Sequence, residues 1–136
     1  MIKHQELDFR SALAGIFLGL AAAAVGGCAL LDSRPPEEVL KERAQVRWDA
    51  LVTGDIKGAY QFLSPGSRAV LTSEAYASTI RAGFWKTAVV ERVSCEKPDV
   101  CDVHGAIEYD HRGSRIKSPV KETWIKEGSS WWFVQK

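Results

Sequence analysis

The chain has 136 residues, with 18 Lys or Arg and 17 Asp or Glu, so its formal net charge at pH 7 is +1. This balance excludes the strongly basic surface with which proteins hold nucleic acid, and it excludes a polybasic patch for anionic lipid. The length that follows the N-terminal apolar run suffices for one domain with one hydrophobic core.

The first feature along the chain is an uncharged apolar run that ends at a cysteine. Residues 11–24 read SALAGIFLGLAAAA, and Val25, Gly26 and Gly27 then lead to Cys28. The pattern resembles the lipobox of bacterial lipoproteins, which implies cleavage before Cys28, diacylglycerol on its sulfur and acylation of its new amino group. A retained transmembrane anchor is one alternative, although the run is at or below the roughly 20 residues that span a bilayer. A simple secretory signal is the other alternative.

This resemblance divides the chain into a signal peptide (1–27), a lipidated tether (28–36) and one domain (37–136). We expect the protein to bind the membrane through the lipid on Cys28, because more than one acyl chain makes anchoring stable. The next residue, Ala29, is not the aspartate that resembles an inner-membrane retention signal. The resemblance therefore implies the periplasmic face of the outer membrane.

The first half of the domain has apolar residues at helical spacing. Pro36 and two glutamates predict the start of a helix that ends at 53–54. Asp55 is expected to cap a second, shorter helix. Residues 64–66 are expected to break the chain, and the spacing over residues 73–80 predicts a third helix. The apolar positions expected to face inward are Leu40, Ala44, Trp48, Leu51 and Val52, then Ile56, Ala59, Tyr60 and Leu63, and finally Ala75, Tyr76 and Ile80.

From Thr87 onward the apolar period changes to two, which is typical of half-buried strands. In the first strand, Val89 and Val93 are expected to share one face. Turn residues divide this half of the domain into four strands, which form an antiparallel meander because the loops between them are short. The helices must cover one face of this sheet. We predict an α+β fold with three N-terminal helices packed on a curled four-stranded antiparallel sheet.

The segment 48–65 reads WDALVTGDIKGAYQFLSP, in which an aromatic residue leads through a Gly-Asp turn into a helix that ends Tyr-x-x-Leu-Ser-Pro. This segment, together with Arg68 and Tyr76, resembles the nuclear transport factor 2-like superfamily. The resemblance covers most of 37–136 and implies a cone with a cystatin-like sheet, but it carries no catalytic signature. Small lipoproteins of the barrel-assembly machinery also pack helices on a sheet, but they have two helices and three strands.

Two cysteines flank turn residues in the strand half. Cys95 and Cys101 are therefore expected to face each other across a hairpin. A structural disulfide agrees with an oxidising compartment. The alternatives are two free thiols, a metal site and a redox pair. A metal site needs further ligands, of which only His104 and His111 are near, and a redox pair prefers Cys-x-x-Cys at a helix start.

Enzymes of the superfamily that the chain resembles place Asp, His or Tyr in an apolar pocket inside the cone, where burial shifts the pKa toward acid–base work. The acidic and histidine candidates here have simpler interpretations. Asp49 is expected to be solvated and Asp55 to cap a helix, while His104 faces outward and His111 lies in a turn. The tyrosine candidates are Tyr60, Tyr76 and Tyr109. We expect no catalytic residue, no metal and no cofactor.

An aromatic group near the C-terminus is the strongest functional signal after Cys28. Trp124, Trp131 and Trp132 fall in adjacent strands, and the last two must point to opposite faces because they are neighbours in one strand. Ordinary packing, an exposed partner-binding surface and the lining of a pocket all remain open.

We therefore expect a membrane-anchored periplasmic lipoprotein that is a non-enzymatic binding or scaffolding module, with a protein of the envelope as its partner. The alternative is a small apolar ligand-binding protein, or an isomerase- or dehydratase-like enzyme that uses the pocket of the cone.

Overall fold

The first helix begins and ends where the sequence predicts. In the computed structural model, which describes residues 33–136, α1 spans Pro36–Thr53. Pro36 lies in the first turn, and two glutamates follow at the positive end of the helix dipole. Gly54 ends the helix with a φ of 82°, a left-handed conformation that glycine adopts without steric cost. The predicted signal peptide and Cys28 lie outside the described residues.

Three short helices follow, so the domain has four helices where the sequence predicted three. They are α2 (Ile56–Tyr60), α3 (Pro65–Val70) and α4 (Ser73–Thr79). The additional helix is α3, since the Ser-Pro-Gly segment that was expected to break the chain begins a helix. Ser64 accepts a hydrogen bond from the Ser67 amide, and the proline occupies a favoured first-turn position. Asp55 caps α2 as predicted, whereas Thr72 and not Ser73 caps α4.

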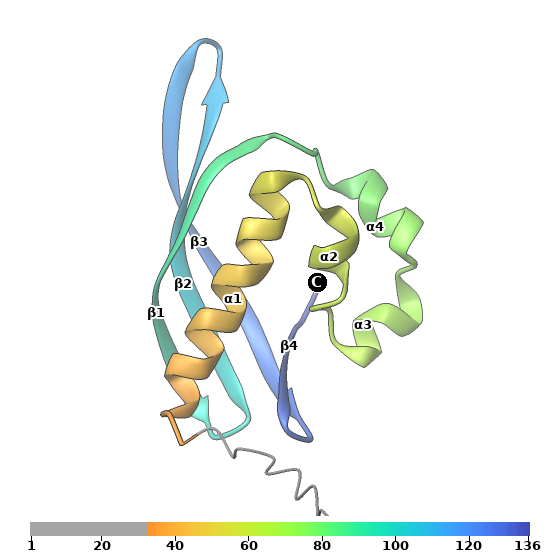
Figure 1. Ribbon diagram of the computed structural model, residues 1–136, viewed down its shortest axis with the longest axis vertical. Helices are drawn as coiled ribbons and strands as arrows, with labels where there is room; N and C mark the ends of the chain where they lie inside the picture. The colour runs from red at the N-terminus through yellow and green to blue at the C-terminus, as the bar shows by residue number, and fades with distance from the viewer. Residues whose placement is uncertain (1–32) are drawn as a thin grey trace, which may run out of the picture. The chain divides into compact units, whose positions relative to one another are not determined.

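The second half of the domain is the predicted antiparallel meander. Its strands are β1 (Trp85–Lys97), β2 (Val100–His111), β3 (Ser114–Glu127) and β4 (Ser130–Phe133), which lie in that order across one sheet. Helix α1 lies across one face of the sheet, and the three short helices gather beyond β4 (Figure 1). The predicted α+β fold, with N-terminal helices on a four-stranded antiparallel sheet, is confirmed.

Strand β4 is flanked on its outer side by the segment that joins α2 to α3. Leu63 forms a parallel bridge with Phe133, the Ser64 amide donates to the Phe133 carbonyl, and the Phe133 amide donates to the Phe62 carbonyl, the last two at 2.8 Å. These hydrogen bonds hold the helical and strand halves together at the edge of the sheet.

A β-bulge in β1 changes which valines are buried. The pairing of β1 with β2 shifts between Val90 and Arg92, so one extra residue lies on the β1 side. Val90 is therefore buried, while Val89, which was expected to share the face of Val93, is 57% exposed. Opposite the bulge, a Cβ on Gly105 would lie 2.4 Å from the Val89 carbonyl oxygen, so only glycine fits there.

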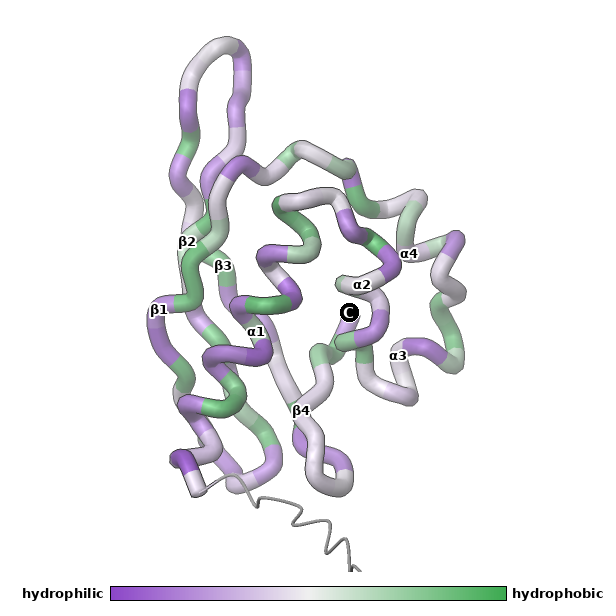
Figure 2. Tube along the Cα trace, in the orientation of Figure 1, coloured by the Kyte–Doolittle hydropathy of each residue, from purple (hydrophilic) through white to green (hydrophobic). Residues whose placement is uncertain are grey.

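The core lies between α1 and the sheet. It contains three tryptophans, and apolar residues alternate with hydrophilic ones along the elements that enclose it (Figure 2). No helix within residues 33–136 is both long and apolar enough to cross a membrane. The buried hydrophobic residues of the core are Leu40, Ala44, Trp48, Leu51, Ala59, Leu63, Tyr76, Val90, Cys101, Val103, Trp124, Trp131 and Phe133.

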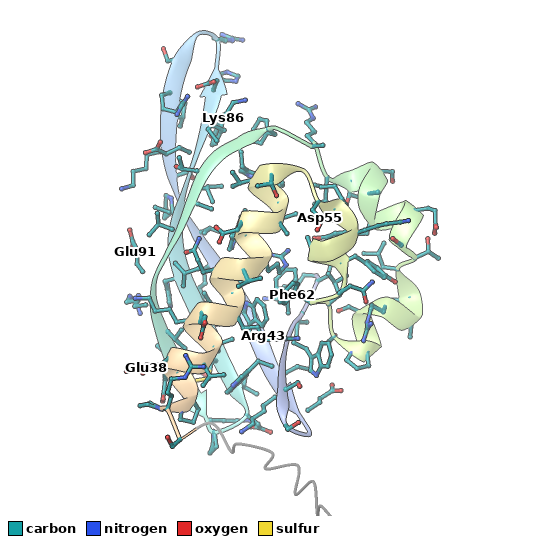
Figure 3. All side chains as sticks on the ribbon, in the orientation of Figure 1. Glu38, Arg43, Asp55, Phe62, Lys86 and Glu91 are labelled. Carbon is teal, nitrogen blue, oxygen red and sulfur yellow. A yellow bond between two sulfur atoms is a disulfide. The ribbon has the colours of Figure 1, made fainter. Side chains whose placement is uncertain are left out.

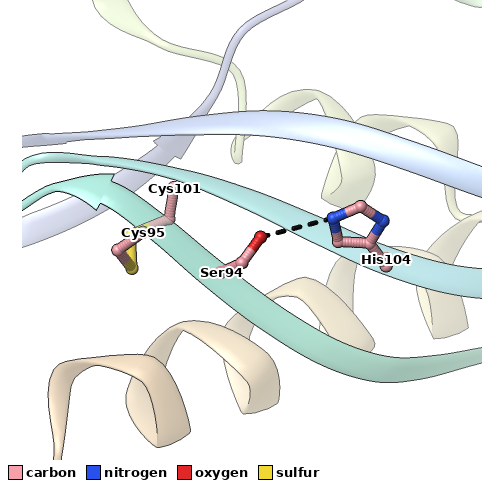
Figure 4. The surroundings of a disulfide bond; sticks show 4 residues. All are labelled: Ser94, Cys95, Cys101 and His104. Carbon is pink, nitrogen blue, oxygen red and sulfur yellow. Dashed lines mark hydrogen bonds between the residues drawn. A yellow bond between two sulfur atoms is a disulfide. The ribbon is translucent and has the colours of Figure 1, made fainter.

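The structure contains the Cys95–Cys101 disulfide, which joins β1 to β2 next to the turn between them (Figure 4). Replacing both cysteines with alanine should lower the free energy of unfolding by about 2 kcal/mol, because the bridge restricts the unfolded chain in a short loop. Urea denaturation followed by circular dichroism measures this loss. The wild type under reducing conditions should lose the same amount, and an unchanged midpoint in both samples would contradict a stabilising role.

Candidate functional site

The only charged side chains buried among the described residues form an ion pair in the core. Arg47 of α1 is 3% exposed and Glu122 of β3 is 7% exposed, and their side chains meet at 2.6 Å. Glu122 also accepts a hydrogen bond from the Trp124 indole, and Arg47 donates to the Tyr76 hydroxyl. The guanidinium lies over the Phe133 ring, 3.8 Å from its centroid. Both carboxylate oxygens of Glu122 therefore have donors.

A cleft of about 420 Å³ lies beside this pair, between β3 and the C-terminal residues. Trp48, Phe133 and Val120 give it an apolar wall, and Glu122 is the acidic residue that lines it. Because Glu122 already has two protein donors, it is held as a structural acceptor. The remaining lining residues are Lys121, Thr123, Val134, Gln135 and Lys136.

The acidic and tyrosine candidates from the helical half do not converge on one site. Asp49 is exposed and accepts a hydrogen bond from the Gln45 side chain, and Asp55 is the cap of α2. The Tyr60 hydroxyl donates to the Leu71 carbonyl. Tyr76 alone reaches the buried ion pair.

The candidates from the strand half are also separate from one another. His104 lies near Arg92 and Ser94, as Figure 4 shows for the serine, on the side of the sheet away from α1. Tyr109 stacks on Phe84, and His111 is exposed at the end of β2. No pair of these residues forms an acid–base constellation.

The three tryptophans singled out in the sequence divide into two buried residues and one at the surface. Trp124 is fully buried and Trp131 is 2% exposed, so both belong to the core, and neither lines the cleft beside Glu122. Trp132 is half-buried, as expected for the opposite face of β4. The candidate partner surface therefore narrows to Trp132 and its neighbours.

Two arginines from different helices approach the ring of Trp132. The Arg43 guanidinium is 5.2 Å from the centroid of the Trp132 ring, and the Arg68 guanidinium is 5.3 Å from it. Arg43 also lies over Phe62, at 4.8 Å, and Figure 3 shows these two residues near each other between α1 and β4. We call Arg43, Phe62, Arg68 and Trp132 the arginine–tryptophan cluster.

Neither arginine of this cluster has a carboxylate within 4.0 Å in residues 33–136. The Arg43 Nε donates to the Trp131 carbonyl at 2.7 Å, and partial burial lowers the pKa of Arg43 from its ordinary value. The Arg68 Nε is buried and has no hydrogen-bond acceptor in the described part of the chain. The aromatic rings position both cations, but no carboxylate of the described residues neutralises them.

Apolar surface adjoins the cluster. A groove of about 270 Å³ runs between α1 and Phe62. Val39 and Val46 line it together with Arg43 and with Glu42, whose carboxylate pairs with Arg34. Val46 is 51% exposed. This is the arrangement of aromatic, arginine and apolar residues that is enriched at the centres of protein interfaces.

The sequence contained a signal for the buried ion pair that its interpretation missed. Arg47 lies three residues after Ala44 and four before Leu51, so it falls on the buried stripe of α1. Glu122 has the strand parity of Val120 and Trp124. Two opposite charges at inward positions of different elements indicate a buried pair. The cluster gave no such signal, because its members come from elements that meet only in the folded chain.

No model of a protein family and no curated protein matches this sequence. Solved structures share the fold. A SEC-C motif containing protein from Psychrobacter arcticus aligns with a TM-score of 0.57 and 16% identity. The alignment covers 75% of this chain and 60% of that protein's length. A protein from Campylobacter jejuni described as an NTF2-like transpeptidase aligns with a TM-score of 0.54 and 13% identity, over 71% of this chain and 98% of that one.

A third structure, a SEC-C motif containing protein from Rhodopseudomonas palustris, aligns with a TM-score of 0.54 and 16% identity. The alignment covers 74% of this chain and 75% of that one. These similarities show a nuclear transport factor 2-like fold, as the resemblance implied. At such low identity they extend to the fold alone.

Proposed function

We propose that this chain is a lipid-anchored protein of the bacterial cell envelope, and that its nuclear transport factor 2-like domain binds another envelope protein without catalysis. The observation that carries the proposal is the core between α1 and the sheet. Trp124, Trp131 and Phe133 pack in it, and its two buried charges, Arg47 and Glu122, neutralise each other, so the acid beside the cleft is already bound by protein donors. A partner is therefore best accommodated on the outer surface.

The lipid anchor is supported by the run that leads to Cys28 and by the cysteine pair of the domain. A disulfide between Cys95 and Cys101 persists in an oxidising compartment such as the periplasm. The residue after Cys28 is Ala29, which favours the periplasmic face of the outer membrane over retention at the inner membrane.

Replacing Cys28 with alanine, with residues 1–27 exchanged for a secretory signal that is cleaved without lipidation, is expected to move the mature protein from the detergent phase to the aqueous phase of a Triton X-114 separation. The substitution removes the acceptor of the lipid, and two or more acyl chains account for stable anchoring. Mass spectrometry of the wild type should show loss of residues 1–27 and added acyl groups on Cys28.

Ser33→Ala serves as the matched control, since it changes the tether without touching the cysteine, and it should stay in the detergent phase. A mature Cys28→Ala protein that still enters the detergent phase would contradict the lipoprotein proposal, and an intact, unlipidated N-terminus in the wild type would favour a retained anchor at 11–27.

The cleft beside Glu122 is the observation that favours the second candidate, a domain that binds or transforms a small apolar molecule. Native mass spectrometry of the protein extracted from its own envelope separates the two. A protein-sized adduct supports the binding module, whereas a small-molecule adduct that Phe133→Ala abolishes supports the cleft.

A further inference from the structure

We propose that the arginine–tryptophan cluster binds a carboxylate of an acidic segment in a partner protein. The inference rests on the proposed function and names the chemistry of the partner that this surface takes. Three properties of the cluster support the inference: its charge, its geometry and its apolar surroundings.

The charge comes first. Arg47 and Arg115, on other parts of the domain, each have a carboxylate partner. Arg43 and Arg68 have none in the part of the chain that the structure describes, although both approach the Trp132 ring. Two cations held near one ring repel each other, and partial burial strengthens that repulsion because water screens it less. An anion bound to either guanidinium offsets that charge.

The geometry favours a carboxylate. A guanidinium presents a planar fork of N–H donors that matches the two oxygens of a carboxylate. The Arg43 Nε already donates to the Trp131 carbonyl, which fixes the plane of the group and leaves its terminal nitrogens for a ligand. The Arg68 Nε is sealed from solvent, so it is the terminal nitrogens of this guanidinium, which donate no hydrogen bond within residues 33–136, that face a ligand. The donors are therefore positioned before an anion arrives.

The apolar surroundings favour a protein segment as the occupant. The groove beside Arg43 and Phe62, of about 270 Å³, is large enough for an apolar side chain next to the bound carboxylate. Val46, which lines this groove, is 51% exposed and adds apolar area. A segment in which acidic and apolar residues alternate complements both parts of this surface, whereas a lipid headgroup or inorganic anion would leave the apolar part uncovered.

The test uses the full-length protein in detergent micelles and fluorescent synthetic peptides in which leucine alternates with aspartate, lysine or serine. Fluorescence anisotropy should show binding of the aspartate peptide, and weaker binding as salt is raised. Replacing both cluster arginines, Arg43→Gln with Arg68→Gln, should weaken that binding at least tenfold. The lysine and serine peptides should bind neither protein.

The matched control replaces two exposed arginines elsewhere, Arg81→Gln with Arg112→Gln, which changes the net charge equally and should leave the affinity within about twofold. Circular dichroism confirms that each variant is folded. Equal binding of the aspartate peptide by both double variants would overturn the inference, as would its failure to bind the wild type.

Phosphatidylglycerol vesicles and the Cys28→Ala protein show whether the bound anion belongs to a protein or to a lipid headgroup. They also separate this inference from the proposed lipid anchor. Arginine-dependent binding of the unlipidated protein to these vesicles, with no binding of the aspartate peptide, would overturn the inference in favour of a lipid headgroup. If the peptide fails to bind while Cys28-dependent partitioning persists, the inference is wrong and the lipid anchor stands.

Discussion

Replacing Glu122 with leucine is expected to lower the free energy of unfolding by about 3–5 kcal/mol. The substitution removes the carboxylate that faces Arg47, so a guanidinium that is 3% exposed stays in the core without a counter-charge. It also removes the acceptor of the Trp124 indole. A domain of this size has a total stability of about 5–15 kcal/mol, so urea denaturation followed by circular dichroism will resolve the loss.

A double variant separates the charge from the packing. Arg47→Met with Glu122→Leu removes both charges and keeps apolar volume, so most of the lost stability should return. The control is Lys121→Met. Lys121 immediately precedes Glu122 in β3 and pairs with Asp102, but its side chain is 60% exposed. Its cost should stay within about 0.5 kcal/mol. A Glu122→Leu protein with the same urea midpoint of unfolding as the wild type would contradict a stabilising role for the ion pair.

The parts of the fold that local chemistry determines were predicted from the sequence. The limits of α1 follow from Pro36 and Gly54, each of which acts through its own backbone preference. The cap at Asp55 and the change of apolar period near Thr87 are local in the same way. These signals predicted the order of helices and strands, and that order led to the correct fold.

The errors arose where a neighbouring segment decides the structure. The bulge between Val90 and Arg92 depends on how β1 pairs with β2, so alternation within β1 alone placed Val89 incorrectly. Ser64 both caps α3 and donates its amide to the Phe133 carbonyl of β4. That distant contact stabilises a helix that was taken for a chain break.

The candidate site was harder to predict because its parts are far apart in the chain. The sequence predicted that Trp131 and Trp132 point to opposite faces of one strand without deciding which is exposed, and the structure places Trp132 at the surface, half-buried. Arg43 and Arg68 belong to α1 and α3, and nothing in their local sequence indicates that they meet at one ring. Surface charges become a site only through the packing of the elements that carry them.

Replacing Trp124 with alanine should lower the free energy of unfolding by about 3–5 kcal/mol, since the side chain is fully buried and leaves a large cavity. The indole packs against Phe62 and Phe133, and its N–H donates to Glu122, so the variant also removes a donor from the buried ion pair. Thermal unfolding followed by far-ultraviolet circular dichroism measures the loss without relying on tryptophan fluorescence.

Trp132→Ala is the matched comparison because it removes the same type of side chain from the neighbouring strand β4, at a half-buried position. Its two cation–π contacts and partial burial account for about 1 kcal/mol. We therefore expect a small change in melting temperature together with weaker binding of the acidic peptide. If Trp132→Ala destabilises the protein as much as Trp124→Ala, then Trp132 is a packing residue, and the cluster around it is part of the core and not a binding surface.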